Sequence, residues 1–184
     1  MFYARKCENF ERVNDRDRQV AGIDTIFDFN DNHYVCDEKA AIRYINKNLK
    51  TFAFELSFLN RSGCLTDGWL LSDKKVNNSF LLVWIDKAKK DIIESSDDIE
   101  VAQLCLVRRD AILEHLDSLG WSIENLSRKD MEIRSDEDCY LGDIYKDHVK
   151  FSYSWKLFEK PINVLLPRKK LVEISDFSEF LEKK

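Results

Sequence analysis

The sequence predicts an α/β fold of the α+β kind, with a central mixed β-sheet flanked by helices. Segments rich in β-branched and aromatic residues are separated by charged segments that lack Gly and Pro, as expected when strands and helices share one chain. With 184 residues, 44% of them apolar, the chain can bury a core without disulfide staples. No internal repeat or linker interrupts it, so we predict a single domain spanning residues 1–184.

In the first half, residues 4–20 are charged and predict an exposed helix. Residues 22–29 and 33–41 are strand-like and flank a short Asn/Asp segment, which predicts a β-hairpin. Residues 41–48 then predict a short helical turn. Alternation over residues 51–58 and an apolar run over 79–86 predict two further strands.

In the second half, a capping pattern at Asp97 and apolar residues at helical spacing predict a helix that ends at Gly120. A second helix is predicted over 122–133, followed by an acidic loop over 134–143. The remaining predictions are strands over 148–155 and 162–174 and a short helix over 175–184.

The composition excludes several classes of protein. No apolar stretch reaches the roughly 18 residues needed to span a bilayer, and the charged N-terminal residues do not form a signal peptide. The 5 cysteines are scattered without metal-ligand spacing, so we expect reduced thiols and a cytoplasmic protein. A net charge of −5 argues against a protein that coats nucleic acid nonspecifically. A local basic surface stays open, with candidates at Lys87, Lys89, Lys90, residues 108–109 and residues 166–171; ordinary surface charge is the alternative.

The hairpin places charged residues in a specific arrangement. If Asn30 and Asp31 form a two-residue loop, Asp24 lies directly opposite Asp37, with Lys39 two residues along on the same face. A register slip of one residue would instead put another acid opposite Asp24. Glu55, on the less apolar face of the strand over 51–58, would approach them if that strand joined the same sheet.

Facing carboxylates repel each other, and a divalent cation would offset the repulsion. Mg²⁺ takes one or two carboxylates together with water molecules, and Mn²⁺ is the alternative ion. A neighbouring Lys could orient a water molecule or stabilise charge on a phosphate. The pattern therefore predicts metal-assisted hydrolysis of phosphodiesters.

Asp24, followed after twelve residues by Asp37-Glu38-Lys39 on the next strand, resembles the motif of the PD-(D/E)xK nuclease superfamily, whose members share a restriction-endonuclease-like fold. The resemblance covers about residues 5–86 and leaves residues 96–184 as additions. It implies a magnesium-dependent nuclease in which Asp24 and Asp37 bind the metal and Lys39 assists catalysis. Many members of the superfamily add a Glu from the first helix. The candidates are Glu8 and Glu11, and we assign Glu11 as a metal ligand and Glu55 as a further catalytic candidate.

The implied partner is nucleic acid, DNA in preference to RNA, with protein partners or a homodimer as open alternatives and no membrane partner. The competing interpretation is a charged strand end in a non-catalytic α/β binding module, or in a subunit of a larger complex. Triplets of the (D/E)xK type also occur at residues 73–75 and 182–184, as expected when 34% of residues are charged. The context of a hairpin and an opposing acid distinguishes the triplet at 37–39 from these.

Overall fold

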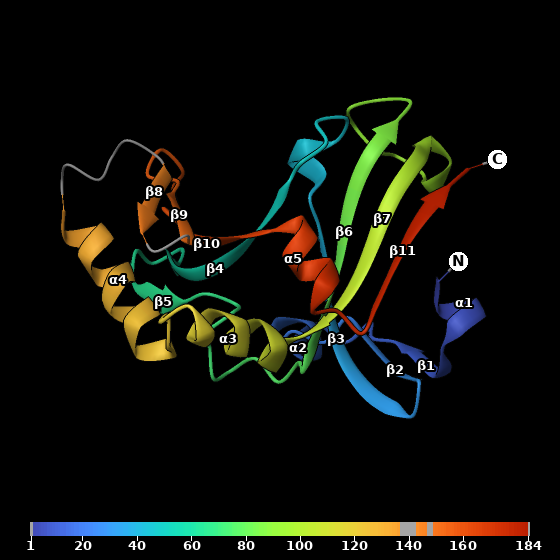
Figure 1. Ribbon diagram of the computed structural model, residues 1–184, viewed down its shortest axis with the longest axis horizontal. Helices are drawn as coiled ribbons and strands as arrows, with labels where there is room; N and C mark the ends of the chain where they lie inside the picture. The colour runs from blue at the N-terminus through green and yellow to red at the C-terminus, as the bar shows by residue number, and fades with distance from the viewer. Residues whose placement is uncertain (1, 137–142, 147–148, 184) are drawn as a thin grey trace. The chain divides into compact units, whose positions relative to one another are not determined.

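The computed structural model describes residues 2–136, 143–146 and 149–183, and its fold is mixed α/β (Figure 1). Its internal contacts divide the chain into two compact units, each with its own β-sheet. Unit 1 comprises Met1–Lys50, Lys74–Ala111 and Lys169–Lys184, and unit 2 comprises Thr51–Asp73 and Ile112–Arg168. None of the helices in the described ranges has the length and apolar character needed to cross a bilayer.

Unit 1 is built on a six-stranded mixed sheet with the strand order β1-β2-β3-β6-β7-β11. Only the pair β3 and β6 is parallel. The elements of this unit are α1 (Phe2–Lys6), β1 (Glu8–Arg12), α2 (Arg16–Val20), β2 (Thr25–Phe29), β3 (Asn32–Ala40), the 3-10 turn η1 (Ile42–Tyr44), β6 (Ser79–Ala88), the 3-10 turn η2 (Ser96–Asp98), β7 (Ile99–Arg108), α5 (Arg168–Glu173) and β11 (Phe177–Glu182).

One face of this sheet carries an aromatic and aliphatic core. Tyr3 from α1 packs on it, and its ring lies 5.2 Å from that of Phe27. The buried members of this core are Tyr3, Phe27, Phe29, Tyr34, Cys36, Leu81, Leu104 and Leu106. The opposite face is also apolar at its centre, because Phe80 and Leu82 are fully buried there. The middle strands are therefore covered on both sides, which stabilises the hairpin next to them.

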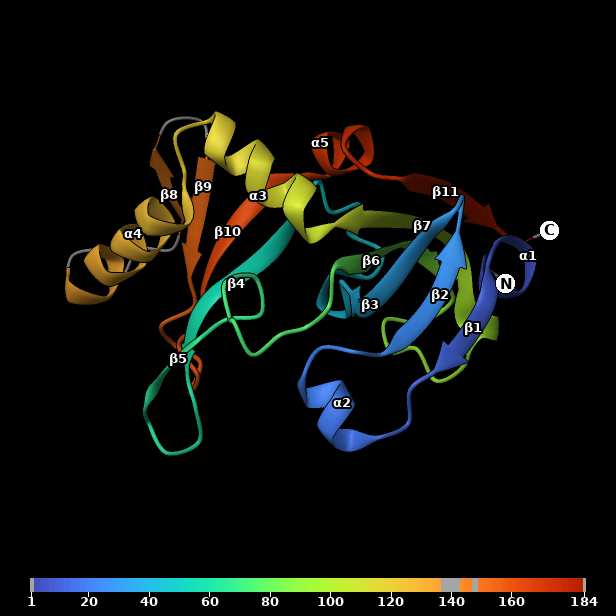
Figure 2. The same ribbon diagram turned by 90° about the horizontal axis from the view of Figure 1, so that it is seen from below.

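The predicted hairpin of β2 and β3 is confirmed (Figure 2), and their residue pairing confirms its register. Phe29 pairs with Asn32, so the loop consists of two residues, Asn30 and Asp31. Both loop residues have positive φ angles, 48° and 61°, as a type I′ turn requires. Asn and Asp tolerate this conformation better than other non-glycine residues, so the loop sequence itself fixes the pairing.

The predicted helix over 4–20 is wrong, because that segment forms α1, the edge strand β1 and α2. The charged stretch has no continuous apolar helical face to bury, and pairing with β2 decides its conformation instead. Val13 is buried and Asp15 caps α2 by accepting a hydrogen bond from the backbone N–H of Arg18 at 2.8 Å. Asn9, with a φ of 49°, interrupts the pairing of β1.

The helix predicted from Asp97 is wrong over most of its length. A short turn with a Ser95 cap leads into strand β7, and the helix α3 (Arg109–Ser118) begins only after it. Six successive residues of β7, 102–107, are buried between β6 and β11, and an apolar run covered on both faces has no period that distinguishes strand from helix. The predicted terminal helix is likewise wrong. Residues 177–182 form strand β11, which pairs with the edge of β7 opposite β6.

Unit 2 is built on a five-stranded antiparallel sheet with the strand order β5-β4-β10-β9-β8. The predicted strand over 51–58 and helix over 122–133 are confirmed. Within the helical turn predicted over 41–48, a 3-10 turn forms over residues 42–44, in unit 1. The strand predicted to run to 174 instead ends at Pro167, and the chain continues as α5. Much of the predicted acidic loop lies outside the described residues. The elements of unit 2 are β4 (Thr51–Leu59), β5 (Leu65–Asp67), most of α3, α4 (Ile123–Ser135), β8 (Asp143–Lys146), β9 (Val149–Tyr153) and β10 (Ile162–Pro167).

Candidate functional site

The hairpin brings Asp24 and Asp37 together, as the sequence predicts. The backbone N–H of Asp24 donates to the carbonyl of Cys36 at 2.9 Å, which extends the hairpin register by one residue beyond β2. The Asp24 carboxylate accepts a 2.8 Å hydrogen bond from the backbone N–H of Glu38. The side chain of Asp24 is therefore held across the hairpin, beside the strand that carries the triplet.

Asp37 is the most buried member of the site, with only 2% of its surface exposed. Its neighbour on the parallel strand β6 is Phe80, which offers no polar contact. Its Oδ1 lies 2.6 Å from the Nζ of Lys39, whereas its buried Oδ2 has no hydrogen-bond partner within residues 2–136, 143–146 and 149–183. Burial raises the pKa of Asp37 to about 6; the nearby Asp24 acts in the same direction, and Lys39 opposes the shift.

Asp24 and Asp37 are the residues here that could hold a hard cation. Their carboxylates share one face of the sheet, one buried oxygen has no hydrogen-bond partner among the described residues, and a cation would offset the repulsion between them. Lys39, one third exposed, lies at the solvent side of Asp37. The described parts of the chain contain no group of three or more His, Cys, Asp or Glu side chains placed to hold an ion together, so waters would complete the coordination of a bound ion.

Glu38, the middle residue of the triplet, points to the opposite face of the sheet. There it accepts a 2.5 Å hydrogen bond from the Tyr3 hydroxyl and forms an ion pair with Arg12, whose two terminal nitrogens lie 2.5 and 3.2 Å from its oxygens. Burial is the largest cause that raises the pKa of Tyr3. Glu38 thus joins α1 and β1 to β3, a role that the sequence analysis missed because it placed Arg12 on a helix.

The proposed third metal ligand, Glu11, lies on β1 and not on a helix. It pairs with Ile26, two residues from Asp24, and so lies on the same sheet face as Asp24, but in the described residues it forms no three-acid group with Asp24 and Asp37. Its carboxylate forms a 2.6 Å ion pair with Arg18, and half of the side chain is exposed. The other candidate, Glu8, is opposite Asp28, near the far end of the hairpin.

Glu55 is also not brought to the site within this sheet. It lies on β4, which pairs with β5 and β10 in unit 2, and its partner on β10 is Asn163. The strand that joins the hairpin is β6 instead. Alternating apolar residues reveal a strand but not its neighbour, so the sequence could not decide which of the two strands would pair with β3.

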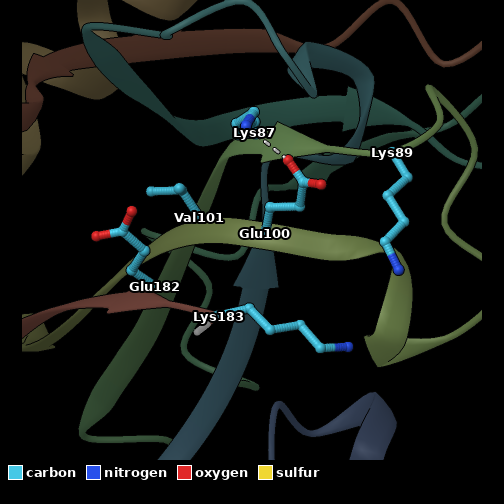
Figure 3. Close-up of a pocket in the computed structure, with 6 residues that line it drawn as sticks. All are labelled: Lys87, Lys89, Glu100, Val101, Glu182 and Lys183. Carbon is cyan, nitrogen blue, oxygen red and sulfur yellow. Dashed lines mark ion pairs between the residues drawn. The ribbon is translucent and has the colours of Figure 1, made fainter.

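Four of the basic residues considered for phosphate binding, Lys87, Lys90, Arg108 and Lys170, form ion pairs with acids. In unit 1, Lys87 and Lys89 line a hollow of about 360 Å³ together with Glu100, Val101, Glu182 and Lys183 (Figure 3). Lys87 lies 2.9 Å from Glu100 in this hollow, and Lys183 lies 2.7 Å from Asp97. Ion pairs also join Lys90 to Glu94, Arg108 to Asp110 and Lys170 to Glu173. At these four positions the acid partner offsets the positive charge that a phosphate would meet.

A second polar cluster, in unit 2, was not predicted. The Ser57 hydroxyl on β4 lies 2.5 Å from the Asp130 carboxylate and 2.5 Å from a guanidinium nitrogen of Arg134, both on α4. Burial raises the pKa of Asp130. Because the hydroxyl donates to the carboxylate and accepts from the guanidinium, its hydrogen-bonding capacity is used within the cluster. These hydrogen bonds hold α4 against β4, so we interpret the cluster as a structural clamp rather than as an activated nucleophile.

Comparisons with known protein families, with curated proteins and with solved structures gave no match for this chain.

Proposed function

We propose that this protein is a metal-dependent phosphodiester hydrolase, a nuclease, with Asp24, Asp37 and Lys39 at its centre. The observation that carries the proposal is the buried Oδ2 of Asp37, which lies on the side of the sheet shared with Asp24 and has no hydrogen-bond partner in the part of the chain that the structure describes. Natural proteins rarely leave such an oxygen unsatisfied unless a ligand or a functional role accounts for it.

The strand arrangement supports the same proposal. The hairpin carries the motif in the predicted register, and β6, the last strand within residues 5–86, pairs with β3 in parallel. We propose that these strands form a restriction-endonuclease-like core. The scattered cysteines of the sequence support a cytoplasmic location as part of the proposal.

In this proposal Asp24 and Asp37 hold Mg²⁺ or Mn²⁺. The ion would polarise the scissile phosphate and lower the pKa of a bound water molecule. The remaining contributions come from the chain itself. The backbone N–H of Glu38 fixes one oxygen of Asp24, and Lys39 turns its ammonium group toward Asp37, where it can orient a water molecule or balance charge on a phosphate. The substrate class is nucleic acid, DNA in preference to RNA.

The test is calorimetric titration of Mg²⁺ and Mn²⁺ into the wild type and into Asp37→Asn, with cleavage assays on single- and double-stranded DNA and RNA. Asp28→Asn is the matched control, because it removes a carboxylate from β2, the partner strand of the same hairpin, near the turn and away from Asp37. We expect Asp37→Asn alone to lose both metal binding and cleavage. A wild type that binds neither metal, even with nucleic acid present, would contradict the proposal.

The alternative is a non-catalytic α/β module that binds a protein or nucleic acid, alone, as a homodimer or within a larger complex. The observation that favours it is the ion pair between Lys39 and Asp37, which satisfies one carboxylate oxygen without a metal, together with the 2% exposure of Asp37. Under this alternative, Asp37→Asn leaves partner binding unchanged.

A further inference from the structure

The loop that joins β9 to β10, residues 154–161, carries three exposed large apolar side chains. Trp155 is 38% exposed, Leu157 is 40% exposed and Phe158 is 71% exposed. The strand residue before this loop, Tyr153, is only 8% exposed, so the exposure begins where the strand ends. A group of neighbouring exposed apolar side chains often marks a site of contact with a ligand or partner.

The backbone of this loop is held in place from two directions. The N–H of Leu59, at the end of β4, donates a 2.6 Å hydrogen bond to the carbonyl of Glu159. The guanidinium group of Arg134 on α4 donates to the carbonyl of Lys160 at 3.1 Å. The aromatic side chains therefore project from a fixed frame within unit 2, which lowers the entropy cost of binding a ligand.

Cationic groups accompany the aromatic residues. The ammonium group of Lys156 lies 5.4 Å from the centre of the Trp155 ring. Lys160 lies in the same loop, and Arg61 follows the β4 end to which the loop is hydrogen-bonded. Glu159 is the single acid among residues 154–161. This surface is therefore locally positive in a chain whose net charge is −5.

We propose that loop 154–161 is a contact surface for single-stranded nucleic acid, with Phe158 and Trp155 stacking on bases and Lys156 meeting the phosphate backbone. The proposal deepens the nuclease function and rests on it. Aromatic faces beside cationic side chains are the combination that binds single strands with little sequence preference. A lipid surface is less well matched, because insertion of Phe158 would carry the adjacent Glu159 toward the apolar boundary.

Phe180 supplies a matched control. It is 64% exposed on β11, but Glu179 and Glu182 lie close to it in sequence, so its surroundings should repel phosphates. Replacing Phe180 or Phe158 with Ala removes a comparably exposed ring in each case. Because both side chains point largely into solvent, neither change should alter the fold.

The test measures the affinity of a fluorescently labelled single-stranded DNA oligonucleotide by anisotropy, in the Asp37→Asn background with EDTA, so that no cleavage occurs. We expect Phe158→Ala to weaken binding by about fivefold to a hundredfold, the usual range for one stacked base. Lys156→Ala should reduce the slope of log affinity against log salt by about 0.7. Phe180→Ala should leave both quantities unchanged.

Three outcomes would overturn the loop proposal: no binding of the oligonucleotide, equal affinity of the Phe158→Ala and Phe180→Ala proteins, or binding that occurs only to vesicles of anionic lipid. Hydrolysis of bis(4-nitrophenyl) phosphate by the metal-loaded protein separates this result from the proposed function. This diester has no polynucleotide chain and so no bases beyond the scissile bond for the loop to contact, and Phe158→Ala should therefore hydrolyse it at the wild-type rate. If the wild type binds the oligonucleotide through the loop but hydrolyses neither the small diester nor a polynucleotide, the nuclease proposal fails and the loop proposal stands.

Discussion

Replacing Asp37 with Asn should stabilise the metal-free protein at neutral and alkaline pH. The physical reason is that the folded chain buries a carboxylate whose charged form is disfavoured by desolvation and by Asp24. Lys39 compensates only in part, because the pKa of Asp37 remains raised to about 6 despite that ion pair. Asn has nearly the same shape and no charge, so it resembles the neutral form that the fold favours.

The magnitude follows from the two pKa values. A rise from 3.8 in the unfolded chain to about 6 in the folded one means that ionisation of Asp37 costs about 3 kcal/mol of folding free energy at high pH. The amide of Asn can also donate a hydrogen bond where the Oδ2 of Asp37 has no partner. Allowing for imperfect geometry of the new amide, we expect a gain of about 1–3 kcal/mol near pH 8.

The sign of the pH dependence is fixed by the direction of the shift. Below the unfolded pKa of 3.8, Asp37 is protonated in both states and carries no ionisation cost. As pH rises toward about 6, the unfolded chain ionises first, so the wild type loses stability through this group. The difference between wild type and Asp37→Asn should therefore shrink below about 1 kcal/mol near pH 4.

Urea denaturation followed by tryptophan fluorescence, in EDTA and at both pH extremes, measures this difference. Asp28→Asn is the control, because its hydrogen bonds to Asn9 and His33 lower the pKa of Asp28, so it should show no such gain. An Asp37→Asn protein that is less stable than the wild type near pH 8 would refute the reasoning, because it would mean that the ion pair with Lys39 outweighs the cost of burial. A gain of equal size at both pH values would refute it as well, because the effect would then be unrelated to ionisation.

Three other substitutions test the fold around the candidate site and in unit 2. Asp31→Gly should stabilise the protein by about 0.5–1 kcal/mol, because glycine adopts the positive φ of the type I′ turn without strain; a loss in thermal denaturation would contradict that turn assignment. Ser57→Ala should cost about 1–3 kcal/mol, since it leaves the buried carboxylate of Asp130 without its short hydrogen bond; denaturation indistinguishable from the wild type would argue against the clamp. Glu38→Gln should cost about 1 kcal/mol in low salt and less in high salt, because the ion pair with Arg12 is partly exposed; a loss independent of salt would show that the Tyr3 hydrogen bond dominates.

The sequence was most informative where a local signal determines the outcome. The two residues Asn30 and Asp31 suit only a few turn types, and the turn type sets the register that places Asp24 opposite Asp37. For the same reason the relation of Lys39 to Asp37, two residues apart on one strand, could be predicted from the sequence and is seen in the structure.

The sequence was least informative where distant segments compete for the same place in a sheet. β6 joins the hairpin and β4 does not, although both segments have the composition of strands. β7 has apolar residues on both faces, and only its burial between β6 and β11 explains why it is not a helix. The ion pair of Arg12 with Glu38 could not be predicted for the same reason. It forms because β1 pairs with β2, and the sequence alone does not reveal that pairing.

The way the chain is shared between the two sheets has a consequence for how the protein is made. β3 and its parallel neighbour β6 are separated in sequence by β4 and β5 of unit 2, and β7 and its neighbour β11 are separated by all the rest of that unit. During synthesis on a ribosome, β4 emerges by Leu59 but its central partner β10 does not begin until Ile162. Long loops must close before these contacts form, which slows folding and leaves the edges of β4 and β7 unpaired in the nascent chain. Until β10 and β11 are made, these exposed strand edges are the places where the nascent chain is prone to aggregate.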